Sequence, residues 1–255
     1  MRQKTDQQVT ADKLVAALKQ DRFILYSQPI KPIRSAADNT GYQEILIRYL
    51  DEEEKLLPPG GFFPILERHK LMPMLDRWVV NRVIRWLLAK QSAHRNWNPS
   101  RCSVNLSRES IANVQFSNFV KEQLQTSKLS PGVLSFEVSE PDAEALAVAL
   151  DRHIAELKPL GCSFVLTSYS GEFIAGELLQ ALGVSFVKID GDIIRNIHHD
   201  HVSLAKTRLI NLSCQALGIR TIGEMVERPE TLEKLKELGV DYAQGYGIAR
   251  PQPLM

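Results

Sequence analysis

The sequence predicts an α/β protein built as a single TIM-like (β/α)8 barrel. Eight short apolar runs, rich in β-branched and aromatic residues, alternate with amphipathic helical stretches along the chain. The length of 255 residues matches the usual size of such a barrel, about 250 residues. The first run is not followed by a glycine-rich turn of the kind found in nucleotide-binding open sheets. These observations favour the barrel over a doubly wound open sheet, which is the structural alternative.

The apolar runs give the order of the predicted strands. They cover residues 23–30, 42–50, 102–107, 133–140, 162–170, 184–194, 219–226 and 242–249. Helical patterns lie between them, for example over residues 76–90, 141–161 and 201–218. Several helical patterns end at a glycine just before the next strand, as helices commonly do. These glycines are Gly161, Gly183, Gly218 and Gly239.

The first 21 residues differ from the rest of the chain. Residues 1–21 precede the first predicted strand and have the pattern of a polar amphipathic helix, with Leu14 and Leu18 on one face. We interpret this segment as an N-terminal connector helix to something upstream. Residues 22–255 then form one barrel domain, because no linker rich in proline or glycine divides them.

Composition excludes several classes of protein. A hydrophobic fraction of 44% and a charged fraction of 24% are typical of a soluble globular domain. Lys and Arg number 31 against 30 Asp and Glu, so no global field indicates a nucleic-acid partner. The chain has no 18-residue apolar stretch and no apolar segment of a signal peptide near its start. We therefore expect a cytoplasmic domain without membrane contact, in which Cys102, Cys162 and Cys214 are reduced, buried thiols.

Polar residues fall where the predicted strands end, which is where barrel active sites gather. Carboxylates grouped with an amide are the ligand set for Mg²⁺ or Mn²⁺, and the cations Arg48 and Lys188 suit phosphate oxygens. The residues alone thus predict a phosphate-ester site whose dependence on a metal is left open. The alternative is a set of buried ion pairs that fills the mouth of the barrel. The polar residues are Glu44, Arg48, Asn105, Glu137, Glu140, Lys188, Asp190, Glu224, Glu227 and Gln244.

A series of short motifs, spread from about residue 21 to 253, resembles those of one family. They are Ser27-Gln28-Pro29, Glu44-Ile45-Leu46-Ile47-Arg48, Phe63-Pro64-Ile65-Leu66-Glu67, Asp76-Arg77-Trp78-Val79, Ser103-Val104-Asn105-Leu106-Ser107, Glu137-Val138-Ser139-Glu140, Lys188-Ile189-Asp190, Glu224-Met225-Val226-Glu227 and Gln244-Gly245-Tyr246 with Arg250-Pro251. In this order and spacing the motifs resemble the EAL domains, bacterial cyclic-di-GMP phosphodiesterases. The second motif resembles the Glu-Ala-Leu-x-Arg signature that gives the family its name.

The resemblance implies a fold and a set of site residues. The fold is an EAL-type barrel with one strand antiparallel to the others, so residues 22–255 would be an EAL-like domain. By resemblance, Glu224 is the proposed base, with Lys188 beside it, and Glu140 steadies the loop after the fifth strand. The implied first-metal ligands are Glu44, Asn105 and Glu137. The implied cyclic-di-GMP contacts are Gln28, Leu46, Arg48, Pro64, Asp76, Asn105, Glu227, Gln244 and Pro251.

One departure from the family pattern concerns the metals. The family carries Asp-Asp-Phe-Gly-x-Gly after the fifth strand, where this sequence has Thr167-Ser168-Tyr169-Ser170-Gly171-Glu172. Thr167 and Ser168 thus replace both metal-binding aspartates with neutral hydroxyls, which are weak ligands for a hard cation. Glu172 is interpreted as an exposed loop residue, and its use as a substitute ligand is the alternative.

These features predict a degenerate EAL domain that binds cyclic-di-GMP without a required cofactor and signals occupancy to a protein effector. It is similar in kind to the EAL receptors of type IV pilus regulators. The alternative is a slow phosphodiesterase, dependent on Mg or Mn, that hydrolyses cyclic-di-GMP to linear pGpG. A scaffold that works through protein contacts alone is disfavoured by the retained Arg48, Asp76 and Glu227. Homodimerisation is left open, and no nucleic-acid partner is expected.

Overall fold

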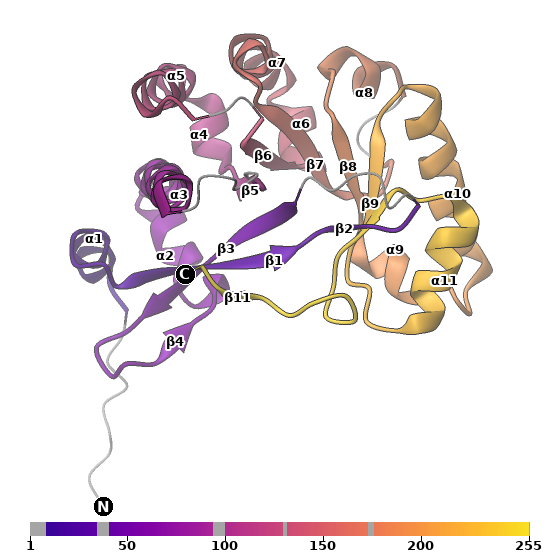
Figure 1. The fold of residues 1–255 in the computed structure, drawn as a ribbon, viewed down its shortest axis with the longest axis horizontal. Coiled ribbons are helices and arrows are strands. Elements are labelled where there is room, and N and C mark those ends of the chain that lie inside the picture. Colours follow the sequence, from indigo (N-terminus) through magenta and orange to yellow (C-terminus); the bar gives the residue numbers. More distant parts are fainter. Residues whose placement is uncertain (1–8, 35–40, 94–99, 130–131, 173–175, 255) are drawn as a thin grey trace, which may run out of the picture.

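The computed structural model describes residues 9–34, 41–93, 100–129, 132–172 and 176–254 (Figure 1). Its strands are β1 (Phe23–Pro29), β2 (Lys31–Pro32), β3 (Tyr42–Leu50), β4 (Leu56–Leu57), β5 (Arg101–Asn105), β6 (Leu134–Ser139), β7 (Ser163–Tyr169), β8 (Phe186–Ile189), β9 (Arg220–Gly223), β10 (Tyr242–Ala243) and β11 (Gln252–Pro253). Its α-helices are α1 (Ala11–Lys19), α2 (Phe63–Arg68), α3 (Met72–Ala93), α4 (Arg108–Ala112), α5 (Gln115–Ser127), α6 (Glu140–Ala145), α7 (Ala147–Leu157), α8 (Gly176–Leu182), α9 (Gly191–Asn196), α10 (His201–Ala216) and α11 (Pro229–Leu238).

The strands form a closed barrel. Their order is β11-β1-β3-β5-β6-β7-β8-β9-β10-β2, with β4 paired to β3. From β3 to β10 the neighbours run parallel, whereas β1 is antiparallel to β3. Only Ile30 separates β1 from β2, and β2 pairs with β10, so the sheet returns to its starting point. The predicted TIM-like (β/α)8 barrel with one antiparallel strand is therefore confirmed, and the open sheet was the wrong alternative.

All eight predicted strands are present, but the later ones are shorter than the apolar runs suggested. The run 184–194 holds only β8, because the side chain of Asp190 accepts a hydrogen bond from the Asp192 N–H at 2.8 Å and starts α9. In the run 242–249 the chain leaves the sheet after β10, and the Gly247 N–H donates to the Val226 carbonyl at 2.9 Å. An apolar stretch therefore continues past the end of the strand in both places.

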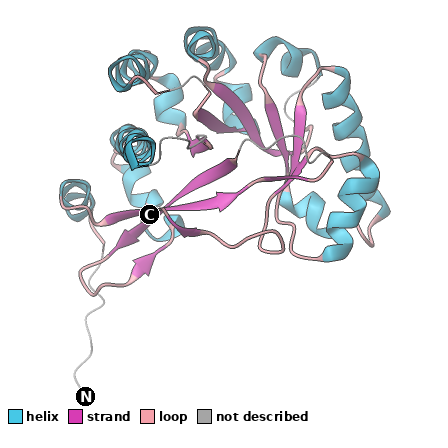
Figure 2. Ribbon diagram, viewed as in Figure 1, coloured by secondary structure: helices cyan, strands magenta, loops and turns pink. Residues whose placement is uncertain are grey.

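The helices lie around the outside of the strands (Figure 2). The predicted helix over residues 141–161 is divided into α6 and α7 at Leu146. The predicted glycine stops are confirmed, since Gly161, Gly183, Gly218 and Gly239 have φ values of 85°, 60°, 71° and 74°. Within the described ranges, no helix is both long and apolar enough to cross a bilayer.

Helix α1 packs against the barrel rather than standing away from it. Its first turn is capped by Thr10, whose side chain accepts from the Lys13 N–H. Leu14 is fully buried, and the Trp78 indole N–H on α3 donates to the Leu18 carbonyl at 3.0 Å. The boundary between a connector at residues 1–21 and a domain at 22–255 stays a prediction, and residues 1–8 of that connector lie outside the described residues.

Side chains at alternate strand positions fill the barrel in two layers, because residues two apart on a strand share a face. We call the first layer the floor. It contains Ile30, Tyr42, Val165, Phe186, Ile222 and Tyr242, which form a buried cluster of their own. We call the second layer the rim, and it takes one residue in or just after each of the eight barrel strands. Its members are Gln28, Glu44, Asn105, Glu137, Thr167, Lys188, Glu224 and Gln244.

Candidate functional site

The strand alternation places most of the predicted polar residues in the rim. Tyr42 and Glu44 are two residues apart on β3, and Phe186 and Lys188 are two apart on β8. In the antiparallel β1 the order is reversed, so Gln28 comes before the floor residue Ile30. The floor residues thus lie toward the amino ends of the parallel strands and the rim residues toward their carboxyl ends.

Lys188 is the centre of the rim. Its side chain is fully buried, and its ammonium nitrogen lies 2.8 Å from Glu44 Oε2 and 2.7 Å from Glu137 Oε2. Glu224 Oε1 is 3.7 Å from the same nitrogen. Three carboxylates, two on β3 and β6 and one just after β9, therefore surround one cation, as the ion-pair alternative for the barrel mouth requires.

Two amide side chains donate further hydrogen bonds to Glu44. Asn105 Nδ2 donates to Glu44 Oε1 at 2.9 Å, and Gln244 Nε2 donates to Glu44 Oε2 at 2.7 Å. Gln244 Nε2 also lies 3.1 Å from Gln28 Oε1, and Gln28 Nε2 donates to the Ala249 carbonyl at 3.0 Å. Gln28, Glu44, Asn105 and Gln244 thus belong to one hydrogen-bonded network that shares Glu44 with the Lys188 cluster.

The carboxylates of the rim differ in pKa. Burial, with the nearby charge of Glu44, raises the pKa of Glu137 to about 7. Burial also raises the pKa of Glu224 to about 7, against the opposing effect of Lys188. For Glu44 burial acts in the same direction, but the charge of Lys188 and the donated hydrogen bonds outweigh it, so that its pKa is lowered. Glu44 is therefore the fixed anion of the site, and the other two carboxylates titrate near neutral pH.

The fifth barrel strand brings only hydroxyls to this site. Thr167 belongs to the rim by its two-residue offset from Val165 and lines a pocket next to it. Ser168 is exposed and has a φ of 51°, in the left-handed region that non-glycine residues rarely adopt. The two positions where the family carries aspartates therefore differ in direction, and only Thr167 lies on the inner face of the barrel.

The loop after β7 is held by Glu140, as the resemblance implied. Glu140 is fully buried, and its Oε2 accepts from the Ser170 N–H at 2.8 Å and from the Ser170 hydroxyl at 3.0 Å. Glu172 is exposed, and its carboxylate lies 3.5 Å from Lys206 Nζ on α10. The arrangement thus supports an exposed loop residue at position 172 rather than a substitute metal ligand.

A pocket of about 590 Å³ opens beside the rim, between β3, β5, β6 and the helices α2 and α3. Leu46, Asp76, Asn105, Glu137 and Thr167 are among its lining residues. Asp76 is buried and accepts from the Ser107 N–H at 3.0 Å and from the Ser107 hydroxyl at 2.6 Å. Burial raises the pKa of Asp76, whereas these hydrogen bonds oppose the shift. The pocket is large enough for part of a dinucleotide and is continuous with the rim.

Other predicted contacts are not gathered at this pocket. Pro64 is exposed on α2, and its neighbour Phe63 lines the pocket instead. Glu227 is exposed after β9 and Pro251 is half-buried after β10, and neither lines the pocket. Arg48 Nη1 donates to the Ile47 carbonyl at 2.8 Å, and its guanidinium lies 5.6 Å from the Tyr26 ring centre. Roles for these four residues stay predictions.

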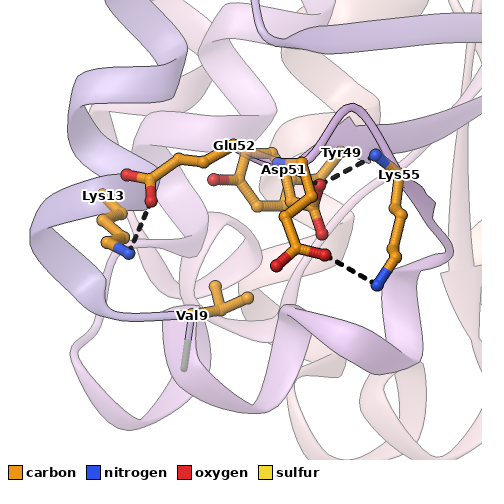
Figure 3. Close-up of a pocket in the computed structure, with 7 residues that line it drawn as sticks. Val9, Lys13, Tyr49, Asp51, Glu52 and Lys55 are labelled. Carbon is orange, nitrogen blue, oxygen red and sulfur yellow. Dashed lines mark hydrogen bonds and ion pairs between the residues drawn. The ribbon is translucent and has the colours of Figure 1, made fainter. Parts of the chain in front are cut away.

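A second, smaller pocket of about 60 Å³ lies where α1 meets the end of β3 and the turn to β4 (Figure 3). Two ion pairs line it, with Lys13 2.9 Å from Glu52 and Lys55 2.8 Å from Glu53. It shares no residue with the rim. These exposed ion pairs match a solvated surface and add nothing to the chemistry of the rim.

The residues at the rim fit a metal only in part. Among the described residues, no group of three or more His, Cys, Asp or Glu side chains is arranged to hold a metal ion. The Lys188 ammonium lies between Glu44 and Glu137, and the Thr167 hydroxyl is a weak ligand for Mg²⁺ or Mn²⁺. One observation points the other way, because Glu137 Oε1 is buried and accepts no hydrogen bond from the described residues. Glu44, Asn105 and Glu137 are the side chains that would hold one ion.

Sequence reasoning missed the residues that support the site. Ser107 fixes Asp76, and Tyr42 lies directly beneath Glu44 on β3. Both could have been identified from the sequence. Ser107 is the last residue of the Ser103–Ser107 motif, and Tyr42 lies two residues before Glu44, so both would share one face of a strand. Arg108, which also lines the pocket, directly follows the motif and carries no signal of its own in the sequence.

The barrel and its rim define an α/β barrel protein with a charged site at the carboxyl ends of its strands. The EAL domain family model matches residues 11–251, so this chain belongs to the EAL domain family. The match begins at the first residue of α1. The expected resemblance is confirmed at the level of the family.

Relatives and solved structures agree with this assignment. The chain is 31% identical over 249 residues to the cyclic di-GMP phosphodiesterase PdeB of Shewanella oneidensis, covering 96% of this chain and 28% of that protein. The FimX EAL domain of Pseudomonas aeruginosa bound to c-di-GMP has a TM-score of 0.85 at 25% identity and 94% coverage of both chains. A c-di-GMP complex of the MucR phosphodiesterase has a TM-score of 0.83 at 26% identity, covering 95% of this chain and 96% of that one. This chain therefore spans less than a third of PdeB.

Proposed function

We propose that this chain is a cyclic-di-GMP receptor domain that binds the nucleotide at the rim and the adjacent pocket and signals its occupancy to a protein partner. The observation that carries the proposal is the rim itself, where the fifth strand contributes the Thr167 hydroxyl and a buried ammonium occupies the space between the carboxylates. The fold neighbours with c-di-GMP bound support the choice of ligand.

The same arrangement disfavours rapid hydrolysis. Cleavage of a phosphodiester needs an activated water and neutralisation of the charge that develops in the transition state. In the family these depend on metals held partly by the two aspartates that Thr167 and Ser168 replace. With neutral side chains at both positions, we expect turnover to fall by orders of magnitude.

Charge at the rim is compatible with an anionic ligand. The pKa values of Glu137 and Glu224 are raised to about 7, so part of each population is protonated at neutral pH. Lys188 neutralises one further negative charge, that of Glu44. The rim thus repels a dianionic nucleotide less than three ionised carboxylates would.

Calorimetric titration with cyclic-di-GMP, with and without EDTA, tests the proposal when it is followed by chromatography for the linear product. We expect saturable binding that EDTA does not change, and no accumulation of pGpG in Mg²⁺ or Mn²⁺. Robust formation of pGpG by the unchanged protein would overturn the receptor reading, and absence of binding would overturn the choice of ligand.

The second candidate is a slow, metal-dependent cyclic-di-GMP phosphodiesterase. It is favoured by the unpartnered Glu137 Oε1 and by the retention of Glu44, Asn105, Lys188 and Glu224 in one rim. The relatives named as phosphodiesterases add to it. It predicts pGpG formation that requires Mn²⁺ or Mg²⁺ and is lost in Glu224→Gln, whereas the receptor predicts that binding survives this change.

Signalling to a protein effector needs a partner-facing surface that changes with occupancy. The loop after β7 joins the rim to the protein surface, since it follows the strand that carries Thr167 and begins at Ser170, which donates two hydrogen bonds to the buried Glu140. We propose that this loop reports the bound nucleotide. Titration of the nucleotide with hydrogen exchange as the readout should then show altered protection in this loop.

A further inference from the structure

The pocket beside the rim has an uneven distribution of charge. Its lining includes the carboxylates Glu67, Asp76, Glu109, Glu137 and Asp142. Against these five acids stands a single cation, Arg108, among the described residues that line the pocket. A pocket proposed to hold a dianion therefore has one cationic side chain in its wall.

Arg108 is held in place by the start of α4. Ser107 is the N-cap of this helix, and its hydroxyl accepts from the Ser110 N–H at 3.3 Å. The same hydroxyl donates to the buried carboxylate of Asp76 at 2.6 Å. Because Arg108 is the next residue, its backbone is held at the pocket by the hydrogen bonds between Ser107 and Asp76.

One ion pair holds the Arg108 side chain above the pocket. Arg108 Nη1 lies 3.2 Å from Asp142 Oδ1, and Asp142 Oδ2 accepts from the Ser139 hydroxyl at 2.9 Å. The side chain of Arg108 is 59% exposed and that of Asp142 is 28% exposed. A pair this exposed contributes about 0–1 kcal/mol to stability. A guanidinium has five N–H donors, so most of them are available to a ligand.

We propose that Arg108 contacts a phosphate of the bound cyclic dinucleotide and that Asp142 competes with the ligand for it. This inference rests on the proposed function. Cyclic-di-GMP has two phosphates, and Arg48 on β3 was the one anchor that the sequence predicted. Arg48 does not line the pocket, whereas Arg108 does, so the two arginines suit the two phosphates. Arginine binds phosphate oxygens by paired, charge-assisted hydrogen bonds, which are stronger than its exposed pair with Asp142.

The competition predicts opposite signs for the two partners. In calorimetric titration with cyclic-di-GMP, we expect Arg108→Ala to weaken binding at least 10-fold. Asp142→Asn, which frees the guanidinium and removes a negative charge, should tighten binding about three-fold. The affinity of Arg108→Lys should lie between those of Arg108→Ala and the unchanged protein, because lysine keeps the charge and loses the paired geometry. The matched control is Lys121→Ala, which breaks a 2.8 Å pair with Glu156 between α5 and α7 and should not change the affinity.

A purely structural pair would give a different result. If Asp142→Asn weakened binding as Arg108→Ala does, the pair would only brace α4 against α6, and the inference would be overturned. Unchanged affinity in Arg108→Ala would also overturn it, while leaving the proposed function intact. Failure of the unchanged protein to bind the nucleotide would overturn both. Circular dichroism and melting temperature confirm folding of each variant, and the Asp142→Asn result alone decides the sign if Arg108→Ala does not fold.

Discussion

The floor and the rim of the barrel are built by the same strands and have opposite chemistry. On β3, β8 and β10, an aromatic floor residue is followed two positions later by a polar rim residue. These pairs are Tyr42 with Glu44, Phe186 with Lys188, and Tyr242 with Gln244. One step of the strand period thus separates a hydrophobic core from a charged site.

The floor is stabilised by aromatic packing. The ring centres of Tyr42 and Phe186 are 5.2 Å apart, and those of Phe186 and Tyr242 are 5.9 Å apart. Two guanidinium groups cover this layer, with Arg101 5.1 Å and Arg220 5.6 Å from the Phe186 ring centre. Burial and aromatic packing of the floor side chains, together with the cation–π contacts of the two arginines, therefore stabilise this end of the barrel.

The rim has buried charges where the floor has rings. Burial of an ionised carboxylate is unfavourable, and it is the main cause that raises the pKa values of Glu137 and Glu224. The ammonium of Lys188 offsets part of this cost at Glu137, 2.7 Å away, and is itself fully buried. The fold thus places a hydrophobic, aromatic layer at one end of the barrel and a charged site at the other.

Removal of the rim cation should have the largest effect. Lys188→Met keeps an unbranched side chain, one atom shorter, but leaves Glu44 and Glu137 close together without a counter-charge. We expect a loss of about 3–5 kcal/mol in the free energy of unfolding at pH 7, the scale for breaking a buried ion pair. Urea unfolding measures this loss. The control is Lys121→Met at the partly exposed pair with Glu156, where at most about 1 kcal/mol should be lost. A loss at Lys188 no larger than the control's would show that the rim charges are not coupled.

Arg48 should affect binding and not stability. Its guanidinium lies at the half-buried end of β3, where its side-chain hydrogen bond goes to the adjacent Ile47 carbonyl. We expect Arg48→Ala to weaken cyclic-di-GMP binding by about 2–3 kcal/mol, the scale of a charge-assisted hydrogen bond, with little change in melting temperature. Calorimetry and thermal unfolding of the same sample measure the two. Glu44→Ala is the comparison variant, and if it or EDTA abolishes binding while Arg48→Ala is tolerated, the nucleotide is held through a metal.

The layers explain why much of the fold was predictable. The eight strands and the glycine stops were visible because apolar periodicity and helix C-terminal glycines are local signals. The barrel was predicted from the count of strands, but the pairings of β2 and β11 were not visible, since these strands have two residues each and pair with distant strands. Leu146, where the predicted helix over 141–161 divides, also carries no local helix-breaking signal.

The site was predictable as a set of residues but not as a geometry. Family motifs and strand ends identified Glu44, Glu137, Lys188 and Glu224. That Lys188 lies within hydrogen-bonding distance of two of them depends on the stagger of β8 against β3 and β6 around the barrel. No local pattern encodes that stagger. For the same reason the sequence did not bring Arg108 and Asp142 together, which lie 34 residues apart.

The rim should also make stability depend on pH. Glu137 and Glu224 have pKa values raised from 4.5 to about 7, so the folded state binds more protons than the unfolded state between these values. Stability must then fall as the pH rises from about 4.5 to about 7, by up to about 1.4 kcal/mol per pH unit for each group. Glu224→Gln should reduce this slope in urea unfolding, whereas the exposed, non-titrating change Gln125→Ala should leave it as it is. An unchanged slope in Glu224→Gln would contradict the raised pKa.

The smallest expected effect lies at the floor and tests the division between the two ends. Arg101 covers the aromatic layer, 5.1 Å from the Phe186 ring centre and 5.6 Å from that of Tyr42. Cation–π contacts at such partly exposed sites contribute about 0.5–1 kcal/mol. Arg101→Ala should therefore lower the free energy of unfolding by about 1 kcal/mol and leave the affinity for cyclic-di-GMP unchanged. Lys90→Ala on α3, which removes a 5.9 Å contact with the Trp86 ring outside the barrel, is the matched control and should cost less. If Arg101→Ala weakened nucleotide binding at constant stability, the aromatic floor would be coupled to the rim through the strands that they share, and the two ends would act as one site.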